Sequence, residues 1–189
     1  FASDHPLNQY EDIFEEYNVV DYLSFINDKE IKDANIAATV LKVQEKKTQK
    51  GNSYAIVKFS DLSGVFELFI FSDIFELNRK VLISGNSLLI SLLKGQLNEE
   101  NRFKRINVKK IVSMGDLINK PIQKIRFQTK KKENIKILSD FAKEEGNTDV
   151  EIELNDNKKK ILFKLKNKRN IQRNMLKSLK KRDISTIIN

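Results

Sequence analysis

The chain has 189 residues and a mass of 22.0 kDa, which is enough for one or two domains with hydrophobic cores. It contains no cysteine and one histidine, which excludes a disulfide framework and a thiolate metal site. No apolar run approaches the roughly 20 residues of a membrane span, and no signal peptide is visible. We therefore expect a cytoplasmic protein with no membrane partner.

The net charge of +9 is unevenly distributed along the sequence. Residues 1–35 carry two lysines and nine acidic residues, giving −7, whereas residues 36–113 give +6 and residues 114–189 give +10. An acidic leader before two basic segments indicates a modular chain whose later parts attract polyanions. An AT-rich genome would account equally well for the lysine total, but it would not explain the segregation of charge.

The first segment, residues 1–35, predicts a helical leader or linker. Pro6 suits the first turn of a helix, where its missing N–H costs little. Apolar residues then recur at helical spacing and predict one packed face, consisting of Ile13, Phe14, Tyr17, Val20 and Leu23. We interpret the lone His5 as structural, because no second histidine or cysteine completes a transition-metal site.

The second segment, residues 36–113, predicts five strands. The clearest signal is Ser53–Phe71, where two apolar-rich runs flank a turn at Asp61–Gly64 and predict a β-hairpin. Strands at 36–45, 87–96 and 102–112, with a short helix after the hairpin, complete the pattern. Three strands, a helix and two further strands follow the order of a Greek-key barrel, the OB-fold. The predicted class is α+β, with a five-stranded OB-fold barrel between the leader and a smaller domain.

Period-two alternation in the hairpin predicts a buried face and a free face. Tyr54 and Phe69 fall on the free face, with Lys58 as a cation between them. A basic loop at 46–52 leads into the hairpin. This combination is typical of single-stranded nucleic-acid binding, in which lysines meet phosphates and aromatic rings stack on bases. The candidate binding residues are Lys46, Lys47, Lys50, Tyr54, Lys58, Phe69, Arg102, Lys104 and Arg105.

The last three cations of this set are binding candidates for a different reason from the two aromatic residues. Arg102, Lys104 and Arg105 flank the turn between the fourth and fifth strands, which borders the binding groove in barrels of this type. Exposed aromatic residues often pack on a neighbouring domain instead. That alternative stays open for Tyr54 and Phe69.

The last segment, residues 115–189, predicts a small α+β domain in the order β-α-β-β-α. Its expected elements are a strand at 122–129, a helix at 133–145, a hairpin of 149–154 with 160–166, and a helix at 171–179. Gly146 is interpreted as the residue that ends the first helix. Residues 184–188 are expected to form a tail strand or a frayed end.

Three sequence elements resemble the C-terminal region of the bacterial DNA polymerase III α subunit. They are residues 1–10 with His5-Pro6-Leu7, the loop Lys46–Asn52, and Phe59–Gly64. Family members show a Ser/Thr-Gly-His-Pro-Leu/Ile element, a lysine-rich loop with glycine, and Leu-Glu/Asp-Asp-x-Thr/Ser-Gly. The resemblance covers residues 1–113, and 114–189 only in outline. It departs at Asp4, where glycine is usual, and at Ile56, where a frequent aromatic residue would supply another stacking platform.

The resemblance implies a fragment of a DNA-directed DNA polymerase, consistent with a sequence that begins at Phe1 rather than Met. Its OB-fold would bind single-stranded template DNA, and its last domain would bind the τ subunit of the clamp loader. The polymerase domains would lie upstream, since these residues contain no catalytic constellation; we expect no cofactor and no small-molecule substrate. Two alternatives remain: a tRNA- or anticodon-binding OB module of a ligase, which should lack the His-Pro-Leu leader, and a protein-interaction OB module.

Overall fold

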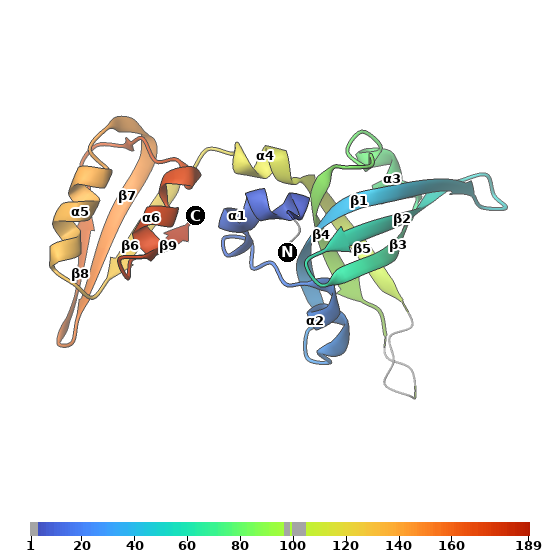
Figure 1. Cartoon of the computed structure of the whole chain (residues 1–189), viewed down its shortest axis with the longest axis horizontal. Coiled ribbons are helices and arrows are strands. Elements are labelled where there is room, and N and C mark those ends of the chain that lie inside the picture. Colours follow the sequence, from blue (N-terminus) through green and yellow to red (C-terminus); the bar gives the residue numbers. More distant parts are fainter. Residues whose placement is uncertain (1–3, 97–98, 100–104) are drawn as a thin grey trace. The chain divides into compact units, whose positions relative to one another are not determined.

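The computed structural model describes residues 4–96, 99 and 105–189, which form an α+β architecture with nine strands in two sheets and six short α-helices (Figure 1). The chain forms two compact units, Phe1–Asn119 and Lys120–Asn189, which we call unit 1 and unit 2. The leader therefore belongs to unit 1. The change of unit lies a few residues after Met114–Gly115, because helix α4 (Met114–Ile118) packs within unit 1.

Unit 1 is built on a five-stranded antiparallel sheet in the order β3-β2-β1-β4-β5. The strands are β1 (Asp33–Lys47), β2 (Ser53–Asp61), β3 (Gly64–Ile70), β4 (Ser87–Lys94) and β5 (Ile106–Ser113). Side chains from all five strands share one buried cluster with Phe75 of helix α3 (Ser72–Asn78). The edge strands β3 and β5 contact each other, but the described residues form no ladder between them, so a closed barrel is not observed.

The β2–β3 hairpin follows the predicted alternation. Val57, Phe59 and Ile70 are fully buried, whereas Val65 and Phe69 on the opposite face are 59% and 51% exposed. Period-two burial arises because successive side chains of a strand point to opposite faces. The prediction of one core face and one free face is confirmed for this hairpin.

A β-bulge at Leu41 changes which face of β1 points inward. The pairing of β1 with β2 shifts between Val40 and Lys42. Before the bulge, Ile36 and Val40 lie in the core, and after it Val43 packs against the core and pairs with Val57. One extra residue therefore turns the even-numbered side chains that follow to the outside.

The leader does not form the single predicted helical face. A 3-10 helix (Pro6–Tyr10) runs into α1 (Glu11–Phe14), but Asn18 then adopts a φ of 50° and breaks the helix. Helix α2 (Tyr22–Asn27) starts afresh, and Leu23 is 55% exposed. The predicted continuous face is therefore wrong.

The leader nevertheless covers part of the sheet. Leu7 and Ile13 are buried against Ala37 of β1 and Leu89 of β4, together with Met114 of α4. Phe25 of α2 enters the main core. Burying apolar side chains on both faces of β1 and β4 accounts for the near-continuous apolar run of β4.

Unit 2 is a four-stranded sheet in the order β8-β7-β6-β9. The strands are β6 (Lys124–Thr129), β7 (Glu145–Asp156), β8 (Lys159–Lys164) and β9 (Ser185–Ile188). β6 and β7 are parallel, joined through helix α5 (Glu133–Phe141), whereas the other pairs are antiparallel. Ile125, Phe127 and Ile152 from one face of the sheet form a core with Leu138 of α5 and Leu179 of α6 (Lys177–Lys180).

Two expectations for unit 2 are corrected by the structure. The helix ends at Phe141, and Gly146 lies within β7, where an added Cβ would sit 2.5 Å from the Asn170 Cα. Glycine is needed there for close backbone approach rather than to end a helix. The expected helix at 171–179 is a 3-10 turn (Arg173–Met175) followed by α6. Residues 185–188 form a paired strand, as one of the two stated alternatives predicts.

Candidate nucleic-acid interface

One sheet surface of unit 1 gathers several of the predicted binding residues. Lys46 pairs with Tyr54 across the β1–β2 ladder, and Lys42 pairs with Lys58. Residues directly opposite on neighbouring strands point to the same side of the sheet. The β2–β3 ladder extends this surface by pairing Ile56 with Phe69 and Lys58 with Glu67. We call this surface the outer face; it comprises Lys42, Gln44, Lys46, Tyr54, Ile56, Lys58, Glu67 and Phe69.

The outer face combines free cations with accessible apolar surface. Lys42, Lys46 and Lys58 are exposed, and none of them forms an ion pair with another residue in the part of the chain that the structure describes. Phe69 is half exposed, and Tyr54 is partly buried. The charges are thus available to an external anion beside rings that offer a flat contact.

The three lysines of the predicted loop do not lie on one surface. β1 extends to Lys47, so Lys46 and Lys47 lie in a strand and point to opposite faces. Only Lys50 lies in the connecting loop, which is closed by hydrogen bonds from the Thr48 N–H to the Asn52 carbonyl and from the Gly51 N–H to the Thr48 carbonyl, both 2.9 Å. Lys46 joins the outer face, and Lys47 does not.

The reverse side of the β1–β2 extension is neutralised by its own residues. The Arg79 guanidinium lies 2.5 Å from Glu45 of β1 and 2.8 Å from Glu76 of α3. These hydrogen bonds from Arg79 lower the pKa of the Glu45 carboxyl to about 2, so it stays ionised at neutral pH. Lys47 therefore shares its side of the ribbon with fixed carboxylates, unlike Lys46.

Arg105, the residue before β5, contacts Phe71, the residue after β3. Its guanidinium carbon lies 5.0 Å from the centroid of the Phe71 ring, and its Nε donates to the Asn107 side chain at 2.7 Å. Phe71 is 45% exposed and follows Phe69 by two residues. The predicted Arg102 and Lys104 lie outside the described residues.

The residues that carry the sequence resemblance hold the leader on the sheet. His5 Nε2 lies 2.9 Å from Ser60 Oγ, while its Nδ1 accepts a hydrogen bond from the Leu7 N–H. Asp61 accepts a 2.6 Å hydrogen bond from the Tyr22 N–H, and its other oxygen accepts from the Ser63 N–H. Burial, together with the Asp61 charge, raises the pKa of the Tyr22 phenol. His5 is thus engaged in structural hydrogen bonds.

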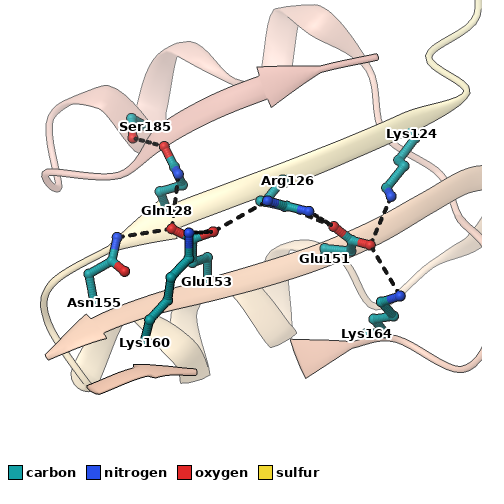
Figure 2. Close-up of polar contacts among 9 residues, drawn as sticks. All are labelled: Lys124, Arg126, Gln128, Glu151, Glu153, Asn155, Lys160, Lys164 and Ser185. Carbon is teal, nitrogen blue, oxygen red and sulfur yellow. Dashed lines mark hydrogen bonds and ion pairs between the residues drawn. The ribbon is translucent and has the colours of Figure 1, made fainter. Parts of the chain in front are cut away.

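Unit 2 presents a second charged sheet surface, shown in Figure 2. Glu151 and Glu153 of β7 are only 4% and 1% exposed. Lys124 and Arg126 of β6 lie 2.9 and 2.7 Å from the Glu151 carboxylate. We call the set the charged face: Lys124, Arg126, Gln128, Glu151, Glu153, Lys160 and Lys164, with further ion pairs at 3.4 Å (Arg126–Glu153), 3.2 Å (Lys160–Glu153) and 3.8 Å (Lys164–Glu151).

The charged face keeps its carboxylates ionised. Hydrogen bonds from Lys124 and Arg126 lower the pKa of Glu151. Burial alone would raise the pKa of Glu153, but hydrogen bonds from Asn155, Lys160 and Gln128 outweigh it and hold that pKa below its ordinary value. Each of the four cations of this face therefore forms an ion pair with Glu151 or Glu153.

Sequence reasoning missed Lys42. Strict alternation from Ile36 would place Lys42 inside, and only the bulge at Leu41 turns it outward. No residue in the stretch Val40–Lys42 signals a bulge by itself, since none is a glycine.

Comparisons with known proteins do not identify the chain: no protein-family model matches it, and a search of curated proteins finds no matching sequence. No helix in the described ranges is long and apolar enough to cross a membrane. Among the same residues there is no group of three or more His, Asp or Glu placed to hold a metal ion.

Proposed function

We propose that unit 1 is an OB-fold module that binds single-stranded DNA on its outer face. The observation that carries the proposal is the juxtaposition of the rings of Tyr54 and Phe69 with Lys42, Lys46 and Lys58, which form no ion pair with another described residue. Single-strand binders combine a cationic track for phosphates with aromatic platforms for bases, and OB-folds use this region of the barrel.

The order of residues across the outer face suits an extended strand. Lys46 lies at one end, and the Lys42–Lys58 pair lies four residues earlier in β1, about 13 Å away at the usual rise per residue. Ile56 and Phe69 occupy the space between these cations. Phosphates would contact the lysines at both ends, while bases stack on Phe69 between them and on Tyr54 beside Lys46, without sequence preference because every base has a π face.

We further propose that the chain belongs to the C-terminal region of a bacterial DNA polymerase III α subunit. The supporting observations are the His5-Pro6-Leu7, Lys46–Asn52 and Phe59–Gly64 elements, together with a five-stranded sheet whose order and shared core suit an OB-fold. In this proposal unit 1 guides template DNA within the replisome, and unit 2 contacts the τ subunit of the clamp loader.

Titration of a fluorescent single-stranded oligonucleotide at several salt concentrations tests the DNA-binding proposal. Each lost phosphate contact should flatten the logarithmic salt slope by about 0.7. Lys46→Ala should show this change. The matched control, Lys47→Ala, removes a neighbouring charge on the opposite face and should leave the slope unchanged.

The triple variant Lys42→Ala, Lys46→Ala and Lys58→Ala should flatten the slope by about two units. Equal effects of Lys46→Ala and Lys47→Ala would move the DNA path off the outer face. Absence of binding at low salt would favour the protein-interaction module. Tighter binding of tRNA than of single-stranded DNA would favour the anticodon-binding module.

A further inference from the structure

β8 is an edge strand with an exposed apolar centre. It stands at one end of the unit 2 sheet and, within the described part of the chain, pairs only with β7. All six of its residues are exposed, and the central Ile161, Leu162 and Phe163 are 40%, 41% and 40% exposed. An edge with three consecutive exposed apolar residues is a template for another strand.

The backbone of β8 has a defined free side. The Leu165 N–H donates to the Val150 carbonyl at 3.0 Å, so residue 165 faces β7. In an antiparallel ladder, inward and outward backbone groups alternate along the strand. Phe163 and Ile161 therefore also bond to β7, whereas Leu162 directs its N–H and its carbonyl to the open edge, as do Lys160 and Lys164.

The positive charge around β8 indicates which kind of segment can bind at this edge. Residues 157–169 contain seven Lys or Arg and no Asp or Glu. Two copies of this edge would bring like charges together, which disfavours self-pairing. Lys160, Lys164 and Lys168 are engaged with Glu153, Glu151 and Asp149, but Lys158, Lys159 and Lys166 form no ion pair with another described residue.

We propose that β8 binds an acidic, extended segment of a partner protein as a fifth strand of the unit 2 sheet. Backbone hydrogen bonds from the Leu162 edge supply affinity, as in other cases of strand addition. Apolar side chains of the partner cover Ile161, Leu162 and Phe163, and its carboxylates face Lys158, Lys159 and Lys166. The inference deepens the partner role proposed for unit 2 and is independent of DNA binding by unit 1.

The proposal is tested by measuring how tightly the full chain binds a synthetic peptide of alternating glutamate and valine. Leu162→Pro removes an outward N–H while leaving the ladder to β7, and proline is tolerated on free edges. Loss of that bond and the clash of the ring should weaken peptide binding by about tenfold or more. Leu162→Ala keeps the N–H and loses only the side-chain contact, so it should weaken peptide binding less than Leu162→Pro does. Circular dichroism checks that each variant is folded.

A second measurement leaves the chain unaltered and so remains informative if Leu162→Pro does not fold. N-methylating alternate peptide residues blocks one edge of the peptide at a time. Methylation of one set should abolish binding, and methylation of the other set should preserve it. Equal binding by both methylated peptides would overturn the proposal.

Further measurements test whether binding depends on the lysine charges around β8. Replacing Lys158, Lys159 and Lys166 with Gln should weaken peptide binding and flatten its salt dependence. A lysine–valine peptide that binds as well as the glutamate–valine peptide would overturn the proposal. Displacement of the bound peptide by oligo(dT), with equal loss of both ligands in the lysine variant, would assign these lysines to nucleic acid instead. Because the probe is a peptide, its failure leaves the DNA-binding proposal for the outer face untouched.

Discussion

The outer face of unit 1 and the charged face of unit 2 differ in where their anions lie. The outer face carries Lys42, Lys46 and Lys58 without described ion pairs, and it includes one carboxylate, Glu67. The charged face holds four cations around the almost fully buried Glu151 and Glu153 (Figure 2). Both surfaces are rich in lysine and arginine.

The number of basic residues therefore does not by itself locate a polyanion site. The segment 114–189 has the larger net charge of the two basic segments, yet its cations on the sheet already have internal partners. An incoming phosphate would have to compete with carboxylates held in place by hydrogen bonds.

Gly146→Ala should selectively destabilise unit 2. The added Cβ would lie 2.5 Å from both the Cα and the N of Asn170, and a backbone cannot yield as a side chain can. We expect a loss of about 3 kcal/mol or more in the unfolding free energy of unit 2, at the upper end of overpacking effects. Differential scanning calorimetry measures it. Single-stranded DNA affinity should persist at a temperature where unit 1 remains folded, and its loss there would tie DNA binding to unit 2.

Phe69→Ala should weaken single-stranded DNA binding by about fivefold to thirtyfold, the lower part of the range for base stacking, because the ring is only half exposed. The loss should be similar at every salt concentration, since stacking releases no counterions. Leu77→Ala on α3 removes a side chain that is 82% exposed and lies off the outer face, and it serves as the control. Equal losses in both variants would contradict the stacking role.

Glu151→Gln should convert part of the charged face into a weak DNA-binding surface. The change frees Lys124, Arg126 and Lys164 from one carboxylate. We expect a gain of roughly threefold in DNA affinity at low salt and a steeper salt slope. Asp140→Asn on α5 makes the same change in net charge away from this face. A gain as large in Asp140→Asn would show that only net charge matters.

The stability of unit 2 should fall in acid because of the same two glutamates. The pKa values of Glu151 and Glu153 are below the ordinary value in the folded state. Their contribution is therefore fully present above pH ~4.5 and is lost as the pH falls through the lower folded values. Unfolding in this window should take up more protons in the wild type than in Glu151→Gln, which lacks one of the two carboxyls. Urea titrations from pH 6 to 3 measure the slope, and an unchanged slope would contradict the assignment.

The hairpin could be predicted from the sequence because the more buried and the more exposed side chains alternate along both of its strands. Phe59 and Phe69 are both phenylalanines, yet period-two counting from the turn assigns one to the core and the other to the surface. The counting works since β2 and β3 pair without a register shift.

The composition of the candidate site could not be predicted for β1. A bulge at Leu41 inverts the parity of the strand, so Lys46 and Lys47 exchange the faces that simple alternation from Ile36 would give them. This bulge requires no particular residue type, so nothing in the sequence reveals it. Lys42 was missed for the same reason.

The structure differs from the sequence-based prediction at two further positions, one a glycine and one an asparagine. Gly146 follows a helical pattern, but it is required by the close approach of the Asn170 backbone, a contact distant in sequence. Asn18 breaks the leader with a positive φ that asparagine tolerates. Local propensity could not rank these possibilities, because tertiary contacts decide between them.

The alternation of backbone groups along β8 has a consequence for hydrogen exchange. Phe163 and Ile161 direct their amides to β7, and the Leu165 amide is bonded to Val150, so these hydrogens should exchange with solvent deuterium only when the edge opens. The intervening amides of Lys160, Leu162 and Lys164 face water and should exchange at once. A single strand would thus show a two-residue rhythm of slow and fast exchange, and an added strand would erase it by slowing the fast set.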